Sequence, residues 1–318
     1  MSNFICLDNR YSTTRYVTKK QPSIENEAKL ESTLNLPENN NRKGEGGLRK
    51  KGYYKIIGKQ SNNEKSINKS PVVTIVTVVF NGEKHLEKTI KSVIGQTYKN
   101  IEYIIIDGGS TDGTLDIIRK YENTIDYWVS EQDAGIYDAW NKGVSLSTGE
   151  WIAFLGADDK YMENAIMEYI NYLNALESVN PEFISSKVNI ISNGKKLRVI
   201  GEKWTWNVFK KYMNTAHVGS LHNRSLFTKY GIFDKEYGIC GDYELLLRPR
   251  KNLRAEFVNS VTANMELGGI SNQNKQVFKE TLKAKVVTGG RNKILCQIDM
   301  YLAIAKWKVR NQFSNLFV

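Results

Sequence analysis

The sequence predicts a doubly wound α/β fold with a mainly parallel sheet and helices on both of its faces. Strand-like and helix-like segments alternate through the middle of the 318-residue chain. The predicted strands of this part are almost entirely apolar and rich in β-branched residues, as expected of strands covered on both faces. Acidic or amide side chains follow directly where these strands end. The chain is long enough for one large domain or two small ones.

The alternation begins only after a polar N-terminal part. Residues 1–70 are rich in Asn, Lys, Ser and Glu and show no apolar period, so we expect a basic, largely flexible leader. Inside it, YYKII at residues 53–57 is a candidate edge strand. VVTIVTVVF at 72–80 then predicts the first buried strand, and apolar residues at helical spacing predict a helix within 82–96.

The same scheme is repeated along residues 101–156. IEYIIIDGGSTDGTLDIIRKY, from residue 101, reads as a strand, a Gly-rich turn and a helix. Two more strands are expected at 125–131 and 151–156, with a crossover helix at 135–149 between them. We therefore expect strands and helices to wind on both sides of one sheet.

The part from residue 161 to 270 has a mixed pattern. A helix is expected from about 161 to 177, and two strands within 183–201 are joined at Asn193-Gly194, a strong hairpin signal. Short helices are expected at 224–231 and 242–251, the second ending near Pro249. This half is therefore expected to be less regular than residues 71–160.

The net charge of +11 is concentrated at the two ends of the chain. Residues 1–70 hold 14 Lys and Arg against 7 Asp and Glu, and residues 271–318 hold 9 against 2, so the centre is slightly acidic. Basic ends favour contact with an anionic membrane surface, and the chain shows no aromatic stacking platform for a nucleic acid. Three dispersed cysteines suit a reducing cytosol, and no signal peptide or long apolar run is visible. We expect a cytoplasmic protein that lies peripherally on a membrane.

The C-terminal tail, residues 271–318, predicts a basic amphipathic helix. Lys306, Lys308 and Arg310 stand near its end, and a set of apolar residues falls on one helical face: Ile294, Ile298, Tyr301, Leu302, Ala305 and Val309. Such a face either lies in a membrane interface or packs on the preceding domain. The sequence leaves both alternatives open.

Polar side chains at the carboxyl ends of the predicted strands mark the candidate site, because ligands of open α/β sheets bind at that edge. They are Asn81, Asp107, Glu131, Asp133 and the adjacent pair Asp158 and Asp159. The two carboxylates of the pair could bind Mg²⁺ or Mn²⁺, which would take its other ligands from phosphate oxygens. Alternatively, they form a solvated turn that caps the next helix. The Asp107 carboxylate could accept a hydrogen bond from the base or the ribose of a bound nucleotide. Alternatively, it forms an Asx-turn.

Two residues in the second half are candidates for proton transfer. Asp242, in GICGDYELLLR, could act as a general base, or it could cap the following helix. His217, in TAHVGSLHNRSLF, could orient an acceptor or a phosphate, or it could be a structural histidine. The residue pattern alone does not decide either case.

Two long motifs carry a family resemblance. TIVTVVFNGEKHLEKTIKSVIGQTYKNIEYIIIDGGSTDGTLDII and SEQDAGIYDAWNKGVSLSTGEWIAFLGADD closely resemble the inverting glycosyltransferases of family 2, which have the GT-A fold. The match is dense over 73–160 and looser to about 269. The resemblance implies a catalytic domain at 71–270, with a nucleotide-sugar half at 71–160 and an acceptor half at 161–270.

The resemblance also implies roles for individual residues. Asp242 matches the catalytic base, although Gly241 stands where the family usually has Glu or another residue, and His217 matches a His-Gln pair although Val218 does not. Asp158 and Asp159 match the Asp-x-Asp region, in which the final acid meets the metal. The donor-binding residues implied are Thr77, Val79 and Asn81 near the base, Asp107 on the base or ribose, Asp133, Asn141 and Lys142 along the donor pocket, and Asp158.

The leading hypothesis is a metal-dependent transfer of one sugar from a UDP or dTDP sugar to a hydroxyl of a lipid-linked oligosaccharide, as in the synthesis of O-antigen or capsule. The Gln-x-x-Arg-Trp motif of processive synthases does not follow Asp242, so one sugar per encounter is expected. A non-catalytic nucleotide-sugar scaffold and a nucleotidyltransferase are the alternatives. The donor sugar, the acceptor and the linkage cannot be read from the sequence.

Overall fold

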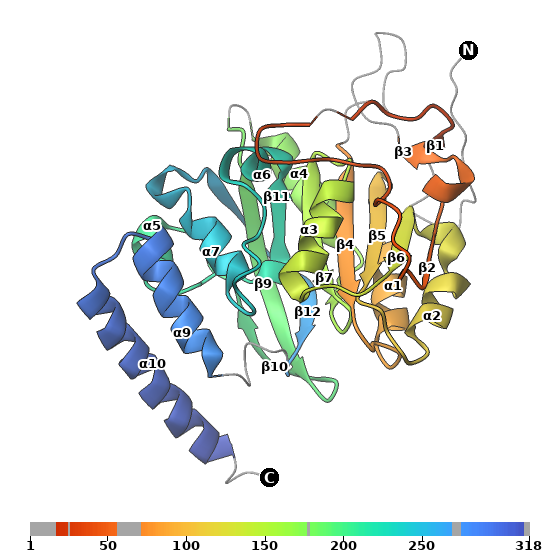
Figure 1. Cartoon of the computed structure of the whole chain (residues 1–318). Coiled ribbons are helices and arrows are strands. Elements are labelled where there is room, and N and C mark those ends of the chain that lie inside the picture. The colour runs from red at the N-terminus through yellow and green to blue at the C-terminus, as the bar shows by residue number, and fades with distance from the viewer. Residues whose placement is uncertain (1–16, 25, 56–70, 177–178, 269–274, 315–318) are drawn as a thin grey trace.

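The computed structural model describes residues 17–24, 26–55, 71–176, 179–268 and 275–314. Their main feature is a ten-stranded sheet with helices on both faces (Figure 1). The strand order is β2-β6-β5-β4-β7-β11-β9-β12-β8, with β10 pairing on β9. The predicted doubly wound α/β class is confirmed.

Four parallel strands form the half of the sheet that the first motifs predicted. They are β4 (Val73–Val79), β5 (Ile101–Asp107), β6 (Tyr127–Ser130) and β7 (Trp151–Gly156). The chain moves outward from β4 to β5 and β6, and β7 then pairs on the other side of β4. The winding direction therefore reverses between β4 and β7, which is where such sheets bind ligands.

Both faces of these strands are buried, which explains their continuous apolar sequence. Ile75 and Ile105 belong to one core cluster, whereas Val76 and Ile104 belong to the cluster on the other face. The first cluster includes residues of α1 (Leu86–Ile94), α2 (Thr114–Lys120) and α4 (Ala165–Ala175). The second includes residues of α3 (Ile136–Leu146), α6 (Arg224–Tyr230) and α7 (Gly241–Leu247).

The other half of the sheet is mixed, as expected. It consists of β8 (Lys160–Tyr161), β9 (Phe183–Ser192), β10 (Lys195–Ile200), β11 (Ser220–Asn223) and β12 (Ala255–Glu266). The predicted hairpin joins β9 and β10, and its central residues Asn193 and Gly194 both have positive φ, 49° and 75°. The helix expected from residue 161 begins only at Ala165, because residues 160–161 pair with β12.

The N-terminal part differs from the expected flexible leader over the residues that the structure describes. β1 (Val17–Thr18) pairs with β3 (Tyr54–Lys55), inside the candidate edge strand, and β2 (Gly44–Gly46) adds to the sheet beside β6. Leu30, Leu34 and Leu48 are buried. Figure 1 shows this segment passing along one end of the sheet and then down its edge. Residues 1–16 and 56–70 lie outside the described part.

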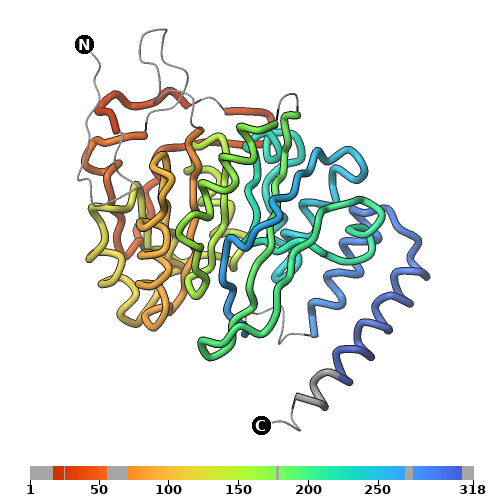
Figure 2. Tube along the Cα trace, turned by 180° about the vertical axis from the view of Figure 1, so that it is seen from behind, coloured from red at the N-terminus to blue at the C-terminus, as the bar shows by residue number. Residues whose placement is uncertain are grey.

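The C-terminal part forms a helical hairpin on the side of the molecule opposite the N-terminal segment (Figure 2). α9 (Gln276–Lys283) continues into a π-helical turn, Ala284–Thr288, and α10 (Lys293–Ser314) packs back along it. Residues 271–274 and 315–318 of the predicted tail are outside the described part. None of the described helices is both long enough and apolar enough to span a membrane.

Candidate functional site

The turns after β4 and β5 are held together at the carboxyl edge of the sheet. The strand register pairs Val79 with Asp107. Asn81, an exposed residue with φ of 52°, accepts a hydrogen bond on Oδ1 from the Thr111 backbone N at 2.9 Å. Its own backbone N donates to Ser110 Oγ at 2.7 Å. Asn81 therefore lies at the predicted edge and fixes the Gly-rich turn.

Asp107 is fully buried at this turn. Its carboxylate accepts from Ser110 N at 3.0 Å, from Ser130 Oγ at 2.5 Å, and from Ser110 Oγ. Asp107 thus holds the loop to its own strand and to β6, through a contact three residues on rather than the two-residue Asx-turn.

Thr77 and Val79 do not reach the edge surface. Thr77 is fully buried, and its hydroxyl accepts from Tyr103 Oη at 3.2 Å. Val79 is 5% exposed and belongs to the core. Both residues build the strand that carries the edge, and neither side chain is presented to a ligand.

Asp133 lies in the loop after β6 and packs against the Gly-rich turn. Its Oδ1 accepts from Gly135 N at 2.9 Å. A Cβ on Gly108 would lie 2.5 Å from Asp133 Oδ2, so the Asp133 carboxylate packs directly against the Gly108 backbone. Burial raises the pKa of Asp133, and the Gly135 N–H opposes that effect. The structure thus brings the Asp107 turn and Asp133 together.

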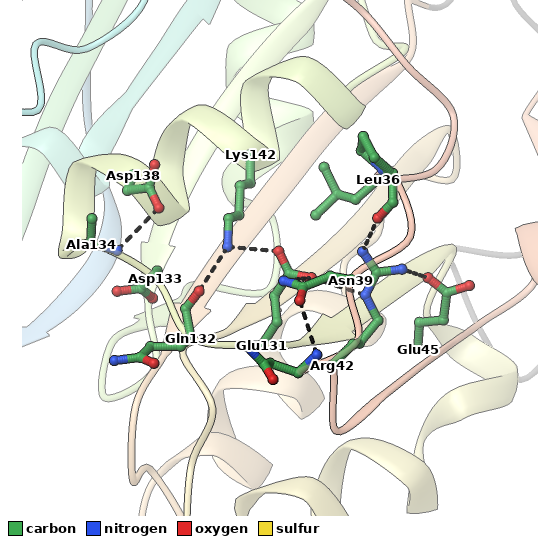
Figure 3. A network of polar contacts seen from close by, with 12 residues as sticks. Leu36, Asn39, Arg42, Glu45, Glu131, Gln132, Asp133, Ala134, Asp138 and Lys142 are labelled. Atoms are coloured by element: carbon green, nitrogen blue, oxygen red, sulfur yellow. Dashed lines mark hydrogen bonds and ion pairs between the residues drawn. The ribbon is translucent and has the colours of Figure 1, made fainter.

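Lys142 and Asn141, on α3, are both engaged within the protein. Lys142 Nζ pairs with Glu131 Oε1 at 2.8 Å and donates to Gln132 O at 3.3 Å (Figure 3). Asn141 is buried and exchanges two hydrogen bonds with the backbone of Phe233, at 2.8 and 2.9 Å. Lys142 therefore stands beside the loop after β6 at the carboxyl edge of the sheet, whereas Asn141 ties α3 to the loop before α7.

Two basic residues of the N-terminal segment also reach this edge. Arg42 Nε donates to Glu131 Oε2 at 2.9 Å (Figure 3). Lys43 Nζ donates to Gly109 O at 2.8 Å and to Ser110 O at 3.0 Å. Sequence reasoning missed both residues because they lie in a stretch without motif or apolar period. Lys43 therefore holds the Asp107 turn and Arg42 holds Glu131, both from the segment that the sequence predicted to be flexible.

Asp158 and Asp159 follow β7, and the carboxylates of both lie against Gly156. A Cβ on Gly156 would lie 3.0 Å from Asp159 Oδ2 and 3.1 Å from Asp158 Oδ1. Asp159 is 8% exposed, and its Oδ1 accepts from Glu266 N at 3.1 Å. Burial and the charge of Asp158 raise the pKa of Asp159 well above its usual value.

These two carboxylates fit a divalent cation. A buried acid beside a second acid has an unfavourable charge that a cation would compensate. Within the described ranges, no group of three or more His, Cys, Asp or Glu side chains is placed to hold a metal. A cation here would therefore take its remaining ligands from water and from a diphosphate, as Mg²⁺ commonly does.

Asp242 lies in the first turn of α7 and faces Tyr137 of α3. Its Oδ1 accepts from Tyr243 N at 2.8 Å and lies 3.2 Å from the Tyr137 hydroxyl. Among the described residues, no donor is placed on Oδ2, so this oxygen is available to take up a proton. A Cβ on Gly241 would lie 2.8 Å from the Tyr137 ring, which explains why glycine precedes Asp242 here.

His217 lies close enough to Asp242 for that carboxylate's charge to act on its ring. Its ring stacks on Phe154 with centroids 5.0 Å apart, and neither ring nitrogen has a hydrogen-bond partner in the described part of the chain. Burial lowers the pKa of His217, and the charge of Asp242 opposes that effect. A neutral, unpartnered imidazole can accept from or donate to a bound hydroxyl.

Glu280, on α9, holds the loop that leads to Asp242. Its buried carboxylate accepts from three consecutive backbone N–H groups, those of Gly238 at 3.1 Å, Ile239 at 2.8 Å and Cys240 at 3.0 Å. Sequence reasoning missed this residue because it assigned residues 271–318 to a separate tail. The tail is instead bonded to the backbone beside the candidate base.

We expect Glu280→Gln to destabilise the fold by about 1.5–3 kcal/mol, the range for hydrogen bonds to a charged group, and to lower kcat more than it changes KM. An amide cannot accept three N–H groups as a carboxylate does, so the loop before Asp242 loosens. Urea unfolding and steady-state kinetics measure both effects. Glu236→Gln, which removes an exposed pair with Lys283, is the control and should change either value little. Equal behaviour of the two variants would contradict a positioning role for Glu280.

Comparison with known proteins gives the same family as the motifs. The model of glycosyl transferase family 2 matches residues 74–236. A PGL/p-HBAD biosynthesis glycosyltransferase of Mycobacterium bovis is 30% identical over 224 residues, 67% of this chain and 84% of that protein. An uncharacterized glycosyltransferase of Rickettsia typhi is 34% identical over 184 residues, and the match spans 55% of this chain and only 58% of that protein.

Solved structures share the fold at low sequence identity. TarS of S. aureus in complex with UDP-GlcNAc has a TM-score of 0.54 and 14% identity, over 72% of this chain and 70% of that one. The mannosyltransferase PcManGT of Pyrobaculum calidifontis, in complex with GDP-Man and Mn²⁺, has a TM-score of 0.51 and 16% identity, over 76% of each chain. These similarities confirm the expected GT-A fold class.

Proposed function

Because the chain belongs to glycosyltransferase family 2, we propose that it transfers one sugar from a nucleoside-diphosphate sugar to an acceptor hydroxyl, with inversion at the anomeric carbon. The donor is proposed to be UDP- or dTDP-linked, and the acceptor a lipid-linked oligosaccharide in the assembly of a surface polysaccharide. The observation that carries the proposal is that, within the described residues, Asp242 Oδ2 receives no hydrogen bond and the His217 ring, on which the Asp242 charge acts, has no hydrogen-bond partner. A base and a second polar group at one place are what transfer to a hydroxyl needs.

The donor is proposed to bind at the edge formed by the Asp107 turn, Asp133 and the two acids after β7. Asp159 and Asp158 would hold a divalent cation, which would supply charge neutralisation to the departing diphosphate. Lys43, Asn81 and Asp107 keep the glycine turn in shape, so that its backbone can approach a nucleotide.

The transfer itself is proposed as a single displacement. Asp242 takes the proton of the acceptor hydroxyl while the hydroxyl oxygen forms a bond to the anomeric carbon. The bond from that carbon to the diphosphate oxygen breaks at the same time, so the configuration inverts. His217 orients the hydroxyl from the neighbouring position, and its lowered pKa keeps it neutral for that role. Each encounter adds one sugar.

The lipid-linked acceptor implies a location on the cytoplasmic face of a plasma membrane. The basic ends of the chain support contact with anionic lipid there.

A donor panel with product analysis tests the proposed function. Each nucleoside-diphosphate sugar is incubated with the protein, Mn²⁺ and a lipid-linked saccharide extract, and the released nucleotide is identified. Release of a nucleoside diphosphate together with a glycoside of inverted configuration is expected. Release of pyrophosphate from a triphosphate would instead identify a nucleotidyltransferase, and donor binding without turnover would identify a scaffold.

A further inference from the structure

The outer face of α10 is an exposed apolar stripe. Six of its side chains are 51–66% exposed: Ile294, Leu295, Ile298, Tyr301, Leu302 and Val309. The opposite face packs on the protein, with Cys296 buried and the Trp307 ring 6.2 Å from that of Phe278 on α9. The sequence left open whether the apolar face covers the domain, and over the described side chains it does not.

The stripe is continuous and has a basic border on each side. In a helix of 3.6 residues per turn, positions 294, 298, 301, 302, 305 and 309 share one face. Lys306 follows Leu302 by four residues and Lys308 follows Tyr301 by seven, so the two lysines stand at opposite borders of the stripe. Both are exposed. Apolar residues flanked by long basic side chains are the pattern of a helix lying in a membrane interface.

The positive charge around α10 indicates that its binding surface is anionic. Residues 275–309 hold eight Lys and Arg but only two acids. Glu280 accepts hydrogen bonds from the loop before Asp242, and Asp299 pairs with Arg291 and Lys285. Within the described part of the chain, Lys279, Lys293, Lys306 and Lys308 have no ion-pair partner. A second copy of this helix would bring like charges together, whereas anionic lipid would neutralise them.

We propose that the outer face of α10 docks this protein onto an anionic lipid bilayer, with the helix lying in the plane of the interface. Only the lipid-linked acceptor that this bilayer would carry rests on the proposed function; the contact of α10 with lipid does not. In Figure 1, α10 descends toward the end of the molecule at which the turns after β4, β5 and β7 lie. Glu280 ties the same helical hairpin to the loop beside Asp242. Docking through α10 would thus hold the candidate base at a fixed height above the membrane.

Vesicle co-sedimentation of the full chain tests this proposal without donor or acceptor. Wild-type protein should sediment with vesicles of phosphatidylcholine and phosphatidylglycerol, more weakly at high salt, and little with phosphatidylcholine alone. Ile298→Glu/Leu302→Glu should abolish sedimentation. Lys306→Gln/Lys308→Gln should weaken it about 30-fold, from about 1 kcal/mol for each basic residue.

Val179→Glu, at an exposed apolar residue before β9, is the matched control and should bind like the wild type. Equal melting temperatures of all variants would show that folding is intact. Binding that survives the Ile298→Glu/Leu302→Glu substitutions would overturn the proposal. So would a wild-type dimer in solution that these substitutions dissociate, because a second copy would then cover the stripe. Neither result depends on glycosyl transfer, so a failed activity assay leaves this test valid.

Discussion

Asp242→Asn is expected to lower kcat by about 10²–10⁴-fold, the contribution of a general base, while donor binding is retained. Asparagine keeps the size of the side chain and can still accept from Tyr243 N, so the first turn of α7 should persist. Its amide cannot take a proton from the acceptor hydroxyl. Initial-rate kinetics with saturating donor, together with a donor-binding isotherm, separate the loss of chemistry from a loss of binding.

Asp234→Asn is the matched control for this prediction. Asp234 lies in the loop before α7, where its Oδ1 accepts from Glu236 N at 2.9 Å. Its substitution should change kcat less than about twofold. Unchanged turnover in Asp242→Asn would contradict the assignment of the base, and an equal loss in both variants would indicate a general effect on the loop.

Arg49→Ala is expected to cost about 3–5 kcal/mol of unfolding free energy, because it leaves a buried carboxylate without its counter-ion. Arg49 Nη2 lies 2.6 Å from Glu102 Oε1, and the two side chains are 2% and 1% exposed. Glu102 also accepts from Thr74 Oγ1 at 2.6 Å and from Thr148 N at 2.8 Å. Burial alone would raise the pKa of Glu102, but Arg49 and these donors bring it below its usual value.

The same prediction has a control two residues along the chain. Lys51, on the same short helical turn, pairs with Glu122 at 3.7 Å in an exposed position, so Lys51→Ala should cost less than about 1 kcal/mol. Urea unfolding of both variants measures the difference. If Arg49→Ala were as stable as Lys51→Ala, the segment from 26 to 55 would not be an integral part of the domain.

The central fold was predictable because its signals are local and repeated. The buried strands read as β-branched runs, and the hairpin at Asn193-Gly194 was fixed by turn chemistry. The N-terminal segment was not predictable in the same way. Its contributions are isolated leucines and single charges such as Arg49 and Lys43, whose partners lie far along the chain. No period or motif marks such residues.

The position of the candidate site could be predicted from the sequence, but the side-chain contacts within it could not. Asn81, Asp133 and the pair Asp158 and Asp159 lie at the expected edge, since the end of a parallel strand fixes that position. Which atoms face a ligand depends on side-chain packing. The hydroxyl groups that surround Asp107, the Phe233 backbone that engages Asn141 and the burial of Thr77 are therefore visible only in three dimensions.

The most direct measurement is the thermal unfolding of the protein with nucleoside diphosphates, with and without Mn²⁺, beside the Asp159→Asn variant. A bound nucleotide at 100 times its Kd should stabilise the wild type by about 2.7 kcal/mol. We expect this shift with UDP or dTDP in the presence of Mn²⁺, a much smaller one without the metal, and no metal effect in Asp159→Asn. No response of the wild type to any nucleotide would contradict a nucleotide-sugar site at this edge of the sheet.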